Sequence, residues 1–66
     1  MSTEIKNMSD MDILDNVFNL DSVIYNSDDS NAVNEATKNR DKLYQEIERR
    51  GYRDFEVFIN KVTRNY

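Results

Sequence analysis

Three aspartates stand close together near the start of the chain, in the run Asp10-Met-Asp12-Ile-Leu-Asp15. Closely spaced carboxylates suggest a calcium loop. An EF-hand loop, however, needs an oxygen ligand at its fifth position, a glycine at its sixth and a bidentate glutamate at its twelfth. Counted from Asp10, those positions hold Leu14, Asp15 and Asp21. We therefore expect no metal site and no bound cofactor.

The same carboxylates fit a second kind of chemistry, which is electrostatic docking. Residues 1–35 hold eight acidic residues against one lysine, a net charge of −7, whereas residues 36–66 hold five acidic against eight basic residues, a net charge of +3. Such a dipolar charge distribution can steer encounters with charged partners. We expect the acidic half to bind a basic surface of a larger protein, including a surface that holds nucleic acid, through Asp12, Asp15, Asn19, Asp28, Asp29 and Glu35. The alternative is that these charges only keep the chain soluble.

Basic side chains near the C-terminus offer a different function. Arg53, Asn60, Lys61 and Arg64 fall on one side of an expected helix, and arginine and asparagine can bind the edges of guanine and adenine. This pattern favours a small helix-turn-helix-like DNA-binding regulator as the main alternative. The net charge of −4 argues against it, because DNA-binding domains normally carry a basic excess.

Catalysis is not expected of this chain. Histidine and cysteine, the most usual general base and the strongest nucleophile, are both absent. A chain of 66 residues is also too short to enclose a ligand cavity of the usual size, roughly 300 Å³ or more. The sequence therefore favours a non-enzymatic protein–protein interaction module, with a structural or assembly subunit as a third alternative.

No sequence motif identifies a family, but the composition is informative. The chain is short and acidic, has nine asparagines, and lacks Cys, His, Pro and Trp. In composition alone it resembles the accessory proteins that bacteriophages encode to modulate host machinery, which implies a modulator or inhibitor of a larger protein. No apolar leader and no apolar run of 18 residues occur, so we expect a cytoplasmic protein without membrane contact.

Helices are the elements expected to position these side chains. Ser9 is a good N-cap for a helix over residues 10–26, which carries carboxylates in its first turn. Apolar residues recur there at spacings of four, three and four, as in one buried stripe: Ile13, Val17, Leu20 and Ile24. The polar run at residues 26–31 then predicts a tight turn into a second helix over residues 30–50. Because this turn is short, the two helices should form an antiparallel hairpin.

A third helix is expected over residues 54–66, with Asp54 as its cap. Its apolar positions follow the spacing of an amphipathic helix: Phe55, Phe58, Ile59, Val62 and Tyr66. We expect this helix to cover the open side of the hairpin. The predicted fold is all-α, with residues 9–66 as a single three-helix domain and residues 1–8 as a flexible N-terminus.

The only glycine, Gly51, follows Arg49 and Arg50. An apolar residue before the glycine and another after it, Ile47 and Tyr52, complete the pattern of a Schellman motif that ends a helix. A phosphate-binding loop would need several glycines. The run is therefore predicted to be a helix terminus.

Small size favours association with another chain. Domains of about 60 residues bury only about 60% of their unfolded surface, and this chain has no cysteine for a disulfide. We therefore expect a homodimer. A second apolar arc of the first helix is either extra core under the third helix or the dimer interface, and we favour the interface: Met11, Leu14, Phe18 and Tyr25.

Overall fold

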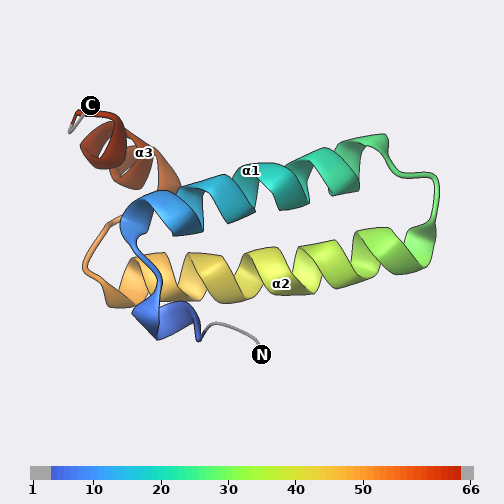
Figure 1. The fold of residues 1–66 in the computed structure, drawn as a ribbon, viewed down its shortest axis with the longest axis horizontal. Coiled ribbons are helices and arrows are strands. Elements are labelled where there is room, and N and C mark those ends of the chain that lie inside the picture. Colours follow the sequence, from blue (N-terminus) through green and yellow to red (C-terminus); the bar gives the residue numbers. More distant parts are fainter. Residues whose placement is uncertain (1–3, 65–66) are drawn as a thin grey trace.

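The computed structural model describes residues 4–64, and these form an all-helical fold without strands (Figure 1). The elements are a 3₁₀ turn, η1 (Ile5–Asn7), and three α-helices: α1 (Asp10–Asn26), α2 (Ser30–Arg49) and α3 (Phe55–Arg64). Helices α1 and α2 run antiparallel as a hairpin, and α3 crosses one end of it (Figure 1). The predicted all-α class and the hairpin are confirmed. The predicted end of the third helix at Tyr66 lies outside the described residues.

Each α-helix begins at a polar side chain that accepts a hydrogen bond from a backbone amide. Such a cap satisfies one of the free N–H groups of the first turn. The three caps are Ser9, which accepts from the Asp12 amide at 3.1 Å, Asp29, from Asn31 at 3.0 Å, and Asp54, from Val57 at 2.9 Å. The polar turn before α2 therefore sets the start of that helix through Asp29.

The end of α2 is the predicted Schellman motif. Gly51 has a φ of +95°, in the left-handed region. Its N–H donates to the carbonyl of Glu48 at 3.0 Å, and the N–H of Tyr52 donates to the carbonyl of Ile47 at 3.3 Å. Both bonds of the motif are present, and Tyr52 packs against the cluster that contains Ile47.

The apolar core lies at the end of the hairpin that α3 crosses. Phe58 of α3 is fully buried against residues of both hairpin helices in a cluster of Ile13, Leu14, Val17, Leu43, Ile47, Phe58 and Val62. Toward the α1–α2 turn, Ala36 is the buried apolar residue, while Ile24 and Val33 are only half-buried.

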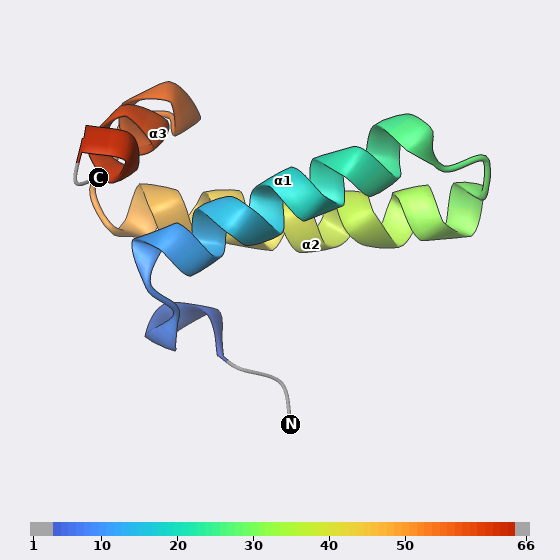
Figure 2. The same cartoon turned by 45° about the horizontal axis from the view of Figure 1, so that its top comes forward.

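Helix α3 covers only part of the open side of the hairpin, although we expected it to cover that side as a whole. At about 1.5 Å per residue, the ten residues of α3 span about 15 Å, whereas the twenty of α2 span about 30 Å. Helix α3 also crosses the hairpin instead of running along it (Figures 1 and 2). The half of the hairpin nearest the turn therefore has no third layer.

The segment before α1, which we expected to be flexible over residues 1–8, contacts the hairpin through Ile5 and Met8. Ile5 and Met8 pack against the core, and their carbonyl oxygens accept hydrogen bonds from Arg50 Nη2 at 3.2 and 2.7 Å. In Figure 2, η1 lies on the face of the hairpin opposite α3, at the same end. Arg50 fixes the segment because its donors point across the end of α2; residues 1–3 lie outside the described residues.

Candidate functional site

Three of the predicted partner-binding residues form a row on α1. Asp12, Asp15 and Asn19 are all exposed, and their spacing of three and four residues places them on one side of the helix. Among residues 4–64, none of their side chains takes part in an ion pair with another residue. We call these three residues the acidic row. Its charges are thus free to interact with a partner.

The other predicted acidic residues lie at the opposite end of α1. Asp28, Asp29 and Glu35 are exposed near the α1–α2 turn. Along the helix axis, the rise from Asp12 to Asn26 alone is about 21 Å. Asp29 also caps α2, so one of its oxygens has a structural role. The structure therefore divides the predicted acidic surface into one group on α1 and a second group on the α1–α2 connection and the start of α2.

The basic side of α3 brings together three of the four residues predicted for nucleic-acid binding. Asn60, Lys61 and Arg64 line one shallow groove together with the exposed Val57. The fourth residue, Arg53, lies in the connection before α3 and lines a different groove. The predicted cluster is thus a set of three residues on one helix.

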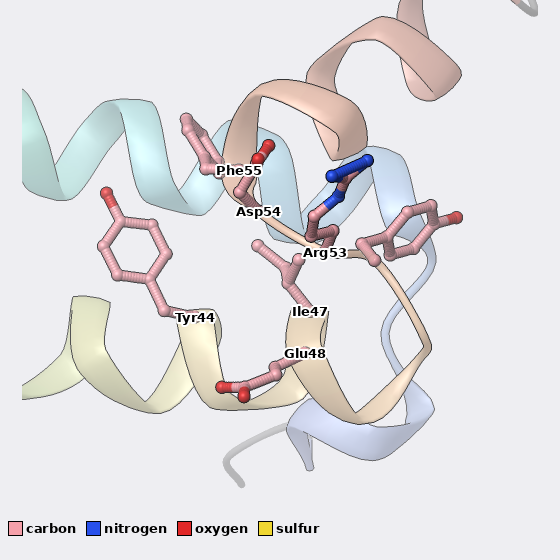
Figure 3. A pocket seen from close by; sticks show the side chains of 7 residues that line it. Tyr44, Ile47, Glu48, Arg53, Asp54 and Phe55 are labelled. Atoms are coloured by element: carbon pink, nitrogen blue, oxygen red, sulfur yellow. The ribbon is translucent and has the colours of Figure 1, made fainter.

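That second groove lies between the end of α2 and the start of α3 (Figure 3). Ile47 points toward the start of α3, with Tyr44 and Phe55 on one side and Arg53 on the other (Figure 3). The volume of this groove is about 210 Å³. Small-molecule sites usually measure roughly 300 Å³ or more, so this groove is smaller than a usual ligand site.

The predicted dimer interface on α1 separates into two pairs of residues. Leu14 is 3% exposed and belongs to the core, and Met11 packs against that core. Phe18 is 50% exposed, and Tyr25 is 77% exposed. Leu14 therefore cannot contact a second chain, which corrects that part of the prediction. Leu14 and Met11 thus belong to the core, and of the four residues only Phe18 and Tyr25 are exposed on the surface.

The exposed aromatic residues continue into a row across the hairpin. Phe55 contacts both Phe18 and Tyr44 edge-on, with ring centroids 6.4 and 5.4 Å apart. Arg40 lies over the ring of Tyr44, with its guanidinium carbon 5.5 Å from the centroid. Edge-on pairs and cation–π contacts of this kind are favourable, so the row is an ordered surface.

An ion pair between the two hairpin helices lies beside this row. Arg40 Nη1 donates to Asp21 Oδ1 at 2.6 Å, and both side chains are about a quarter exposed or less. This hydrogen bond is the main cause that raises the pKa of Arg40, and Tyr25 acts in the same direction. In the sequence, Arg40 stands at helical spacing among the apolar residues Ala36, Leu43 and Ile47. Its partner could have been found from the position of Asp21 on the inner side of α1, between Val17 and Ile24.

A polar cluster joins the ends of α1 and α2. Arg50 donates to Glu46 at 2.7 Å and to Asp10 at 2.6 Å, and the Tyr52 hydroxyl donates to the second oxygen of Asp10 at 2.7 Å. Glu46 is 7% exposed and also accepts two hydrogen bonds from Arg49. The spacing of four residues between Glu46 and Arg50 indicates a pair within α2, but it does not indicate the contact of Arg50 with α1.

These contacts set the pKa values of the two carboxyl groups. Hydrogen bonds from Arg49 and then Arg50 lower the pKa of Glu46 to about 2. Burial raises the pKa of Asp10, but hydrogen bonds from Tyr52 and Arg50 outweigh it, so that pKa is lowered. Both groups are ionised at neutral pH and hold the fold together.

Residues 4–64 offer neither a metal site nor a membrane-spanning helix. This part of the chain contains no group of three or more acidic residues placed to hold a metal ion. None of its helices combines the length and the apolar character that crossing a membrane requires. Comparison of the chain with protein-family models, with curated proteins and with solved structures finds no match.

Proposed function

We propose that this protein is a non-enzymatic protein-binding module that docks the acidic row of α1 onto a basic surface of a larger partner. The observation that carries the proposal is that Asp12 and Asp15 are exposed side by side on one helix and make no ion pair with another residue of the described range 4–64. Their charges are uncompensated until a partner supplies the opposite sign.

The packing behind the acidic row supports the proposal. Ile13 and Val17 are both fully buried on the inner side of α1. They hold that helix against α2 and α3, so the acidic side chains stand on a fixed backbone. A charged surface that is already ordered loses less entropy when it binds, and complementary charge speeds association.

The second acidic group extends the surface along α1. Asp28 and Glu35 are exposed near the turn, roughly 20 Å or more from Asp12 along the helix axis. A long basic groove, such as one that holds nucleic acid, is the kind of partner surface that matches this length. By occupying such a groove, the protein would act as a modulator or inhibitor of its partner.

A charge-reversal variant tests the proposal. A partner is first isolated with the purified protein, and the Kd is then measured over a range of salt concentrations. We expect Asp12→Lys/Asp15→Lys to weaken binding by at least about tenfold while the helical circular dichroism stays unchanged. Binding should also weaken as salt is added, because exposed charges are screened.

The matched control is Glu48→Lys/Glu56→Lys, which makes the same charge change at two exposed positions on α2 and α3. We expect this control to change the Kd much less. An equal loss in both variants would mean that bulk charge and not the acidic row drives binding, and would overturn the proposal.

DNA binding through α3 is the second candidate, favoured by the exposed cluster of Asn60, Lys61 and Arg64. Among residues 4–64, Lys61 and Arg64 make no ion pair that would neutralise them. Retention on a DNA column that is lost in Lys61→Glu/Arg64→Glu would support this function and displace the first.

A further inference from the structure

The groove between the end of α2 and the start of α3 has an apolar floor and aromatic walls. Tyr44, Tyr52 and Phe55 line it around Ile47, which is 3% exposed (Figure 3). All three aromatic side chains are half-buried, so part of each ring is open to solvent. Such a surface favours contact with the apolar part of another molecule, because contact removes apolar area from water. The groove shares no residue with the acidic row and is therefore a separate site.

The charged side chains that line this groove are Glu48, Arg53 and Asp54, and all three are exposed. Two carboxylates and one guanidinium give the lining a net charge of −1. Within residues 4–64, none of the three takes part in an ion pair. Asp54 uses one of its oxygens to cap α3, and Glu48 has no such role. The charges of the lining therefore favour a cation over an anion.

Two of the aromatic rings already attract cations of the chain itself. The guanidinium carbon of Arg40 lies 5.5 Å from the centroid of the Tyr44 ring, and Nζ of Lys61 lies 5.5 Å from the centroid of the Tyr52 ring. Neither of these cations lines the groove. An aromatic ring attracts a cation through the negative charge of its face, and it has two faces, so one bound cation does not exclude a second. The aromatic walls thus agree with the carboxylates in favouring a cationic ligand.

Arginine and lysine side chains combine the two properties that the groove favours. Their methylene stems pack along apolar surface while the charged head stays at its edge. In this groove the stem would lie on Ile47 and Phe55, and the head would lie near Glu48 and Asp54. Because the groove is smaller than a usual small-molecule site, its ligand is better sought as one side chain of a polypeptide than as a free small molecule.

From these observations we propose that the groove between α2 and α3 binds an arginine or lysine side chain of another polypeptide. The apolar floor holds the stem of that side chain, and the aromatic rings and the two carboxylates hold its charge. Arg53 opposes the bound cation, which makes its effect on binding opposite in sign to that of Glu48. This site is additional to the docking surface proposed on α1.

Titration with short peptides, followed by nuclear magnetic resonance, tests the proposal. The probes are three pentapeptides with blocked ends, in which two alanines on each side flank arginine, norleucine or glutamate. Norleucine keeps an apolar stem without a charge. We expect the arginine peptide to shift the methyl signals of Ile47 and to bind with a Kd at least about threefold lower than that of the norleucine peptide. The glutamate peptide should bind more weakly than the arginine peptide.

Two variants test the charges at the groove. Glu48→Gln should raise the Kd of the arginine peptide about threefold, and Arg53→Gln should lower it, because that change removes the opposing cation. Both residues are exposed, so both variants should keep the helical circular dichroism of the wild type. The matched control is Glu56→Gln, which removes a carboxylate at an exposed position of α3 outside the groove and should leave the Kd nearly unchanged.

Three results would overturn the proposal. Unchanged Ile47 signals at the highest peptide concentration would mean that the groove binds no such side chain. Equal binding of the norleucine and arginine peptides would mean that the groove holds apolar groups alone. Weaker binding of the arginine peptide to Arg53→Gln than to the wild type would contradict a cationic ligand in the groove.

The peptides are measured without the partner of the acidic row, so this test and the test of the proposed function can fail separately. At 0.15 M salt, Asp12→Lys/Asp15→Lys should bind the arginine peptide nearly as the wild type does, because exposed charges beyond about 8 Å are largely screened. A loss in this variant as large as in Glu48→Gln would mean that net charge and not the groove binds the peptide, and would also overturn the proposal.

Discussion

The two ends of the helical hairpin are built in different ways. At the α3 end, the fully buried Phe58 seals the core, and Arg50 ties η1, α1 and α2 together. At the turn end, two helices face each other with Ala36 as the buried apolar residue and one ion pair, Asp21–Arg40, between them.

This difference concerns the packing of the two ends. At the α3 end, three helices and η1 meet, and Arg50, Glu46 and Asp10 are joined by hydrogen bonds. The turn end has only two layers and exposes Tyr25. Exposed aromatic side chains of this kind are typical of surfaces that bind.

The largest expected effect comes from the core of the α3 end. Phe58→Ala should destabilise the protein by about 3–5 kcal/mol, because it leaves a cavity where a fully buried ring was. A domain of this size has a total stability of only roughly 3–5 kcal/mol, so this variant should be largely unfolded. Circular dichroism during urea denaturation measures the loss.

The matched change at the turn end is Ile24→Ala, at a half-buried position. We expect the free energy of unfolding to fall by roughly 1–2 kcal/mol, since Ile24 buries less apolar surface than Phe58 does. If Ile24→Ala proved as costly as Phe58→Ala, the two ends would be equally packed and the comparison would fail.

The next effect concerns the charged cluster of the α3 end. Arg50→Met keeps an aliphatic side chain but removes the hydrogen bonds that Arg50 donates to Glu46, Asp10 and the carbonyl groups of Ile5 and Met8. We expect the free energy of unfolding to fall by about 2 kcal/mol, because Glu46 and Asp10 lose the hydrogen bonds that Arg50 donates. Trypsin should also cleave after Lys6 faster than in the wild type, since η1 loses its tether.

The control for this variant is Arg49→Met. The Arg49 side chain is 63% exposed and contacts Glu46 alone, so its loss should cost less and leave cleavage after Lys6 unchanged. Equal cleavage in the two variants would show that Arg50 does not hold η1.

Acid should weaken the same end in a defined pH range. The pKa of Glu46 is lowered from near 4.5 to about 2, so its contribution to stability is complete above pH 4.5 and fades as the pH falls toward 2. Asp10 acts in the same direction. Urea denaturation at several pH values measures the decline, which should be shallower in Glu46→Gln. An identical decline in that variant would exclude Glu46 as its source.

The smallest expected effect tests the junction between α2 and α3. Gly51→Ala should cost about 1 kcal/mol, because alanine is strained at positive φ. No neighbouring atom lies within 4 Å of an added Cβ, so the cost is confined to the backbone. Gly51→Asn should cost less, since asparagine tolerates this conformation better. A Gly51→Ala variant as stable as the wild type would contradict the left-handed geometry.

Much of the fold could be predicted from local sequence signals. Ser9, Asp54 and Gly51 mark helix ends through contacts within a few residues, and apolar spacing identifies the buried side of each helix. These signals act within one helix. They therefore gave the correct bounds of α1 and the Schellman motif of α2.

Contacts between helices were harder to predict. Periodicity shows which side of a helix is buried, but not the register between two helices or the angle at which a third crosses them. For that reason the pairing of Asp21 with Arg40, and of Arg50 with Asp10, was missed. The apolar arc of α1 was recognised, but Leu14 and Phe18 could not be divided between core and surface without the position of α3.

Amide hydrogen exchange tests the central comparison most directly. We predict that amides of residues 43–49 are the best protected, because they belong to the end of the hairpin that α3 covers. Amides of residues 18–26 and 30–40 should exchange faster, because no third layer covers the half of the hairpin nearest the turn. Equal protection along the whole hairpin would contradict the account.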